Sequence, residues 1–329
     1  MTASRALLVA VVCIVVSLAT LAWLVRTPFE MTRLRNALLI DQGVMADFNW
    51  RPGAEPTDFN LETGSAPAEF AELVNASKSN RANGYRTGLA IAQAMTRGSV
   101  TQGNPIQSDT RETLRRITQN NEGYCSDFTQ VFNGLALAAN VPVREWGMSF
   151  DGFSGDGHAF SEIYDDTLEK WVFLDTFNSF YVIDPATETP LSALEFRERL
   201  ATNQAGLAND VRFIDDGAFG MKDAQTAIDY YRRGTSQFFL WFGNDVFAYD
   251  QNAIVKLASG AGRAVEQLTA MMVGVHPRIR VYATANSAPF LDRLKTVRAL
   301  FLFAFLVGLL GASFLLYAVV ALRRGRRAT

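Results

Sequence analysis

Three residues whose types perform nucleophilic catalysis occur in order along this 329-residue chain: Cys125, His158 and Asp175. A cysteine thiolate attacks carbonyl carbon, a histidine takes and returns the proton, and a carboxylate orients the histidine. Since the second cysteine, Cys13, lies in an apolar run, no disulfide can form within the long segment that holds Cys125. Two histidines and no Cys/His cluster argue against a zinc site, so we expect no metal and no cofactor.

The segment that begins at Cys125 predicts an amphipathic helix. The 3.6-residue period is carried by Phe128, Val131, Phe132, Leu135 and Ala139, and Asn140-Val141-Pro142 ends it. Cys125 then lies in the first turn, where unpaired N–H groups and the helix dipole favour a thiolate. The alternative is that Cys125 is a small core residue.

His158 and Asp175 belong to two strand-like runs, 158–164 and 170–175, which flank a polar Asp165-Asp166-Thr167 turn. A turn centred between Asp166 and Thr167 places His158 directly opposite Asp175 as a cross-strand pair. The three residues then form a nucleophile, base and orienting acid. The alternatives are a loop-end histidine and a strand-end aspartate that pairs with a turn.

Together these motifs resemble the transglutaminase-like superfamily, whose cores have a papain-related arrangement. The resemblance covers roughly Arg111 to Pro185 and rests on residues 123–128 with their helix, 141–144, 158–164 and 171–175. It implies an α+β fold in which the helix bearing Cys125 packs on an antiparallel sheet, with Cys125 as nucleophile, His158 as base and Asp175 as orienting acid. Phe160 stands where many members have Trp, and Thr176 where Pro often follows the aspartate.

Two neighbouring residues are further candidates. Gln119, six residues upstream of Cys125 as in papain-like enzymes, is a candidate oxyanion donor beside the Cys125 N–H. Tyr124 is a candidate wall of the acyl pocket. The alternatives are a polar residue at a helix end and a structural aromatic side chain.

Both ends of the chain carry runs without charge, at 6–25 and 299–322, and each is long enough to cross a bilayer core of ~30 Å. The first run also has the spacing of a cleaved signal peptide. The basic cluster at 323–327 places the C-terminus in the cytoplasm, so we expect a two-span cell (inner) membrane protein with both termini inside and the main domain periplasmic or extracellular. Ala304, Gly308 and Ala312 lie four apart, as in a helix-packing stripe or simply as small residues of a span.

The chain is therefore expected to divide into a tail (1–5), a transmembrane helix (6–25), a helical part of the exported loop (26–108), the transglutaminase-like core (109–190), an unassigned α/β part (191–298), a second transmembrane helix (299–322) and a basic tail (323–329). Helices are expected over 29–48, 67–76, 88–96, 109–118, 192–200 and 222–233, and polar loops over 77–83 and 96–111. The aromatic stretch 238–242 is expected to be a buried strand; the alternatives are a segment near the membrane or the lining of a substrate groove.

Composition narrows the function. A chain with 49% hydrophobic and 19% charged residues is not disordered, and a net charge of −2 without a long basic run argues against nucleic-acid binding. The sequence favours a membrane-anchored thiol enzyme that performs acyl transfer or amide hydrolysis on a protein, peptide or envelope polymer, with a role in cell-envelope or surface-polysaccharide assembly. The alternative is a non-catalytic membrane-anchored adaptor for an envelope polymer or export machinery. The oligomeric state is left open.

Overall fold

The computed structural model describes residues 2–77, 84–95, 105–120, 122–214, 221 and 223–327, without the side chains of 46 and 325–327. The chain forms two compact units: one comprises Met1–Ile40, Asp151–Asp156 and Ala285–Thr329, the other Asp41–Phe150 and Gly157–Thr284. The expected polar loops at 77–83 and 96–111, and the expected helix start at position 222, fall wholly or partly outside the described residues.

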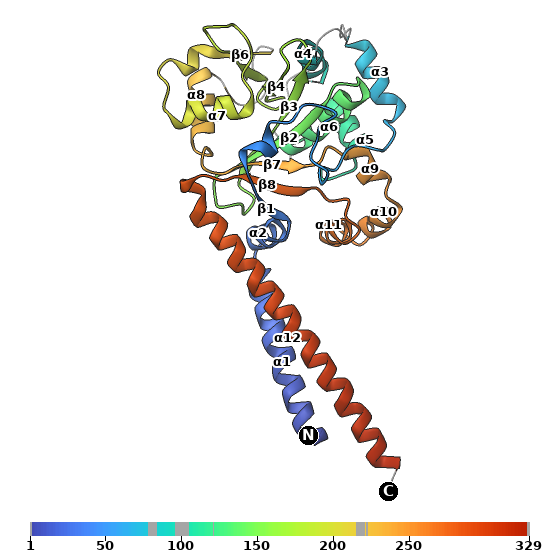
Figure 1. Ribbon diagram of the computed structural model, residues 1–329. Helices are drawn as coiled ribbons and strands as arrows, with labels where there is room; N and C mark the ends of the chain where they lie inside the picture. The colour runs from blue at the N-terminus through green and yellow to red at the C-terminus, as the bar shows by residue number, and fades with distance from the viewer. Residues whose placement is uncertain are drawn as a thin grey trace. The chain divides into compact units, whose positions relative to one another are not determined.

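The second unit is built on a six-stranded sheet with the order β1-β8-β7-β2-β3-β4 (Figure 1). Its strands are β1 (Ile40–Gly43), β2 (Val143–Ser149), β3 (Gly157–Asp165), β4 (Lys170–Leu174), β7 (Phe238–Phe242) and β8 (Arg278–Tyr282). From β8 to β4 each strand pairs antiparallel with its neighbour. A separate two-stranded sheet joins β5 (Phe180–Val182) to β6 (Val211–Phe213).

Helices cover both faces of this sheet, so the unit is a mixed α+β structure as expected. Their bounds are α3 (Ala68–Ala76), α4 (Gly84–Met95), α5 (Thr110–Asn120), α6 (Cys125–Ala138), α7 (Ala193–Ala201), α8 (Ala224–Arg232), α9 (Val246–Gln251), α10 (Ala253–Ser259) and α11 (Arg263–Met272). Side chains of α3 to α6 and α9 share one core with Val143 and Ile163, whereas those of α7 and α8 share the other with Trp146 and Phe160. The two cores take alternate residues of β2 and β3, as the pleat requires.

Helix α6 begins where the sequence predicts. The Asp127 carboxylate accepts the Tyr124 N–H at 2.8 Å and so satisfies an amide just before the first turn. Gly123 has φ +119°, which a residue with a side chain rarely adopts. The helix ends at Ala138, and Asn140 adopts a left-handed conformation before Pro142.

The first unit contains α1 (Ala3–Leu24), α2 (Pro28–Leu39) and α12 (Ala288–Arg327). Helices α1 and α12 are long and apolar enough to cross a membrane, by length and composition. They pack against each other at small residues: a Cβ on Gly308 would lie 2.8 Å from Ser17 Oγ, and one on Gly311 3.0 Å from Cys13 Cβ. The expected stripe is therefore wrong at its last position, because Ala312 is exposed and Gly311 makes the close approach.

Other elements differ from expectation mainly at their ends. The helix expected over 29–48 stops at Leu39, because residues 40–43 instead form β1 beside β8. Helix α4 starts four residues before the expected Gly88. The strand expected over 238–242 forms as β7, but only alternate residues are fully buried, and Phe239 and Trp241 keep part of their surface.

Candidate active site

Cys125 is the first residue of α6 and is half-buried. The first amides of a helix have no acceptor within it, and they point, with the positive end of the helix dipole, toward the N-terminus. Backbone N–H groups at this position can stabilise a thiolate or a developing oxyanion. The main chain thus supplies polar donors beside the sulfur.

His158 lies near the start of β3, and its ring is buried. Its Nε2 is 2.7 Å from Asp175 Oδ2, and its ring is close enough to Cys125 for the charge of the sulfur to act on it. Both the sulfur and the carboxylate therefore act on the ring. The three residues that the sequence singles out are brought together by the fold.

The expected strand register is wrong by two residues. Ser161 pairs with Leu174 and Asp165 with Lys170, so Asp175 continues toward the level of Phe160 rather than of His158. The turn is longer than expected because Asp165 Oδ1 accepts the amides of Thr167 and Leu168, each at 2.9 Å. A shift of two keeps both side chains on one face, and they meet as diagonal neighbours.

Asp175 is fully buried at the end of β4 and accepts hydrogen bonds at both oxygens. Oδ1 takes the amides of Phe177 at 3.1 Å and Asn178 at 2.9 Å. Oδ2 takes the Asn178 side-chain amide and the Tyr231 hydroxyl, each at 2.7 Å, besides facing His158. This set of donors fixes the carboxylate in position and satisfies its charge.

The three groups shift one another's protonation. Burial alone would lower the pKa of His158, but the charges of Asp175 and Cys125 outweigh it and raise that pKa to about 10. Burial would likewise raise the pKa of Asp175, but the His158 charge and the hydrogen bonds from His158 and Asn178 lower it. At neutral pH the site therefore holds a protonated imidazole beside an ionised carboxylate.

Tyr231 and Asn178 are site residues that the sequence analysis missed. Tyr231, from α8, is buried, and its ring centroid is 5.6 Å from that of His158. Burial in the apolar core raises its pKa well above the usual value, and the Asp175 charge adds to this, so the hydroxyl remains a donor. The available signal was weak: a tyrosine on the apolar face of a helix needs a partner for its hydroxyl.

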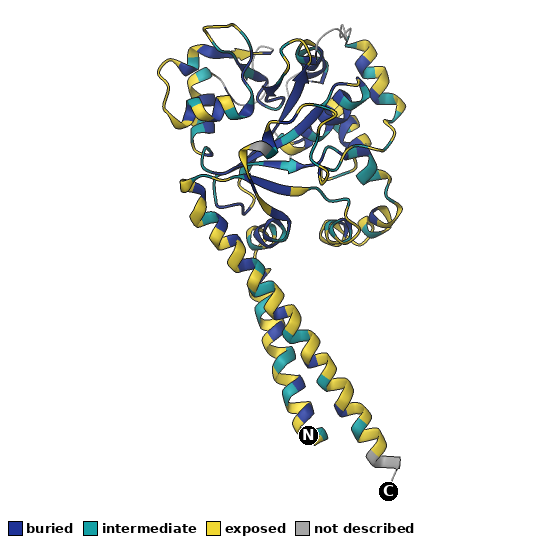
Figure 2. Cartoon of the chain, in the orientation of Figure 1, coloured by how far each residue is buried: buried dark blue, intermediate teal, exposed yellow. Residues whose placement is uncertain are grey.

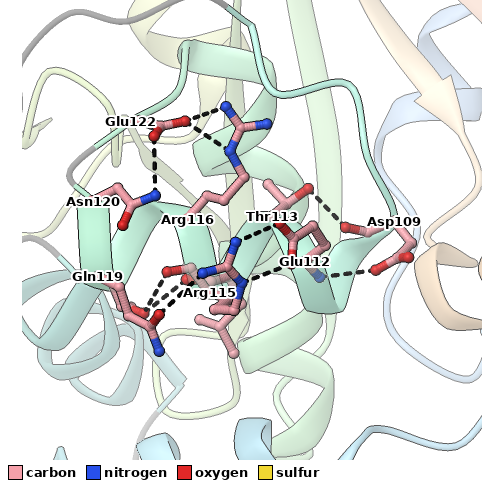
Figure 3. A network of polar contacts seen from close by, with 10 residues as sticks. Asp109, Glu112, Thr113, Arg115, Arg116, Gln119, Asn120 and Glu122 are labelled. Atoms are coloured by element: carbon pink, nitrogen blue, oxygen red, sulfur yellow. Dashed lines mark hydrogen bonds and ion pairs between the residues drawn. The ribbon is translucent and has the colours of Figure 1, made fainter.

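Gln119 lies on the exposed last turn of α5, where its Oε1 accepts a hydrogen bond from Arg115 at 3.2 Å (Figure 3). Arg115 is itself held by Glu112, and Arg116 by Glu122, so Gln119 belongs to a surface network along α5. None of these contacts of Gln119 includes Cys125, and its role as an oxyanion donor stays a prediction. Tyr124 precedes Cys125, and its side chain is 41% exposed, consistent with either role foreseen for it.

Within the described residues, no group of three or more His, Cys, Asp or Glu side chains has the arrangement of a metal site. A half-buried thiol, a buried imidazole and a fixed carboxylate suit covalent attack on a carbonyl.

Comparison with known proteins gives a match to one family model. Residues 71–176 match the sequence model of the transglutaminase-like superfamily, and the match includes Cys125, His158 and Asp175. It starts earlier than the stretch from Arg111 on which the motifs lie. Searches of curated proteins and of solved structures gave no match.

Proposed function

Because residues 71–176 form a transglutaminase-like superfamily domain, we propose that this chain is a membrane-anchored thiol enzyme that acts on carbonyl groups through Cys125. The observation that carries the proposal is the position of His158, whose Nε2 is 2.7 Å from Asp175 Oδ2 and whose ring interacts electrostatically with Cys125. Asp175 is the orienting acid in this scheme. The substrate class is a protein, peptide or envelope polymer that carries an amide or ester.

The reaction begins with the proton of the Cys125 thiol on His158. The sulfur attacks the carbonyl carbon, and the oxyanion that forms is stabilised by backbone N–H groups at the start of α6. The C–N or C–O bond breaks, His158 gives its proton to the leaving group, and a thioester remains on Cys125. Water or an amine then attacks this thioester, His158 accepts the attacker's proton, and the thiolate is released.

The location follows from the ends of the chain. We place α1 and α12 across the cell membrane with both termini in the cytoplasm, because the basic cluster at 323–327 follows the second apolar run. The transglutaminase-like domain then faces the periplasm or exterior. Substrates of the cell envelope, including those of surface-polysaccharide assembly, are accessible there.

Alkylation of the purified full chain tests the proposal. In a Cys13→Ala background we expect iodoacetamide to label native Cys125 at pH 6 at least tenfold faster than the urea-unfolded chain, because His158 holds the thiol proton. His158→Ala should remove the difference. Lys256→Ala, on an exposed helix away from the site, serves as the matched control and should keep it. Equal slow labelling of native and unfolded chains would favour the non-catalytic adaptor instead.

A further inference from the structure

The hairpin of α10 and α11, residues 253–273, has an unusual outer surface. Its exposed large apolar side chains are Ile254, Leu257, Val265, Leu268, Met272 and Val273. Leu257 is 83% and Met272 87% exposed, values that a large apolar residue of a soluble surface rarely reaches in a group. Figure 2 shows the corresponding yellow segments on both helices.

These side chains form stripes along the helices. Val265, Leu268 and Met272 are spaced at i, i+3 and i+7 on α11, whereas Glu266 and Ala270 form its buried side. A surface helix normally presents polar residues outward and apolar residues inward. Helix α8 follows that rule, with Gln225, Thr226 and Asp229 exposed, whereas the hairpin does not.

The exposed charged side chains of the hairpin are all positive. Its exposed ionic side chains are Lys256 and Arg263. The only acid between positions 252 and 275 is Glu266, which is buried and is bonded to Arg263 and to the Tyr249 hydroxyl. An apolar stripe edged by cations and free of exposed carboxylates complements the surface of a bilayer that contains anionic lipid.

We propose that the α10–α11 hairpin is an interfacial membrane-docking element, in which Leu257, Leu268 and Met272 enter the boundary between lipid headgroups and acyl chains. The inference rests on the proposed membrane anchoring of α1 and α12. Helix α12 follows the hairpin in the chain after the single strand β8, so anchoring supplies a bilayer at high effective concentration. Docking would add a third attachment and restrict how the catalytic unit turns above the membrane.

Depth measurement on the full chain tests this. In a Cys13→Ala, Cys125→Ala background, an environment-sensitive NBD dye is attached at Leu268→Cys, at Leu309→Cys in α12, or at Gln225→Cys in α8. The chain is placed at one copy per nanodisc of phosphatidylcholine and phosphatidylglycerol. We expect blue-shifted emission and quenching by doxyl-labelled lipid at positions 268 and 309, with a depth of roughly 5–10 Å at 268, and neither effect at 225.

A second variant probes the cause. Leu257→Glu with Met272→Glu should reduce quenching of the dye at 268 to the level at 225, whereas Gln225→Glu with Thr226→Glu should leave it unchanged. Quenching at 309 with a water-like signal at 268 would overturn hairpin docking while leaving the anchoring intact. A water-like signal at both positions would reject the anchoring and the inference together. If the dye at position 268 shows blue-shifted emission only when two chains share a nanodisc, the hairpin binds a second copy of the chain and not lipid, and the inference is rejected.

Discussion

Asp175 is held by more hydrogen-bond donors than a strand-end aspartate needs. Four donors besides His158 converge on its two oxygens, and the carboxylate has no exposed surface. Burying a charge is costly unless it is paired and hydrogen-bonded, and these donors meet both conditions, which suits a group whose charge is used. The charge stabilises protonated His158.

Asp175→Asn tests that role. The amide keeps the shape but loses the charge, so we expect turnover with a model acyl substrate to fall by about 10²-fold or more. The protein should remain folded, as judged by circular dichroism. Turnover close to that of the wild type would reject the catalytic triad and return Asp175 to a structural role in the turn.

Tyr231→Phe tests whether α8 positions the site. Loss of one hydrogen bond to a carboxylate should reduce turnover by roughly tenfold. Because that donor favours the ionised form, its loss raises the pKa of Asp175, and the acid limb of the pH–rate profile should move to higher pH. Tyr249→Phe removes a hydroxyl bonded to Glu266 elsewhere and is the control. An unchanged acid limb in Tyr231→Phe would show that the hydroxyl serves packing alone.

Asp175 and Tyr231 differ in whether the sequence alone could identify them as site residues. Cys125, His158 and Asp175 are found because their types and local patterns have a chemical meaning. Tyr231 is 56 residues from Asp175 in the chain and belongs to an ordinary amphipathic helix. Its contact depends on how α8 packs over the sheet, which no local pattern specifies.

The sequence predicted the type of an element, helix or strand, more reliably than the residues at which the element begins and ends. The helix at Cys125 and the β3–β4 hairpin follow from periodicity, but the hairpin register depends on side-chain hydrogen bonds within the turn. Glu169, the last residue of this turn, has φ +51°, a left-handed conformation that a glutamate does not predict. Residues 40–43 became a strand because a neighbouring strand, β8, distant in sequence, pairs with them.

Strand β2 carries a conflict between charge and burial. Glu145 is half-buried opposite Ser161, and no hydrogen bond or ion pair reaches its carboxylate within the described residues. Burial raises the pKa of Glu145 to about 8. Arg144, its neighbour on the other face, is by contrast paired with Glu162 at 2.6 Å.

We predict that Glu145→Gln stabilises the protein at high pH. Between the unfolded pKa of about 4.3 and the folded value of about 8, the folded state binds more protons, so wild-type stability falls as pH rises through this window. The variant lacks this fall and should gain about 1–3 kcal/mol at pH 8.5, with little difference at pH 4. Denaturant unfolding at both pH values measures this. If the free energy of unfolding of wild type and of the variant depends on pH in the same way, the Glu145 carboxylate does not have a raised pKa, and the prediction is wrong.

At the scale of the whole molecule, the family match covers only part of the unit that holds Cys125. Residues 71–176 include the three candidate catalytic residues, but Asn178, α8 and strands β7 and β8 lie beyond the match. These parts complete the sheet and hold Asp175. Of the segment 191–298, which the motifs left unassigned, residues 191–284 are thus structurally part of the same unit, whereas residues from Ala285 onward belong to the other unit.

Reporter fusions can test directly on which side of the membrane that unit lies. Cationic residues are retained in the cytoplasm, and the strongest cluster follows the second apolar run. A phosphatase reporter that is active only outside the cytoplasm should therefore work when inserted near Asn104, a position outside the described residues, and fail when fused after Thr329. A reporter that fluoresces only in the cytoplasm should give the opposite result at both sites.

An N-terminal epitope tag supplies the matching control for the first apolar run. If α1 is an uncleaved anchor, the tag stays on the mature chain and is cytoplasmic, whereas a cleaved signal peptide would remove it. Reversal of both reporters would move the Cys125 site into the cytosol and exclude envelope substrates. The thiol chemistry would survive that result, because it depends on the geometry around His158, but the substrate class would have to be chosen again.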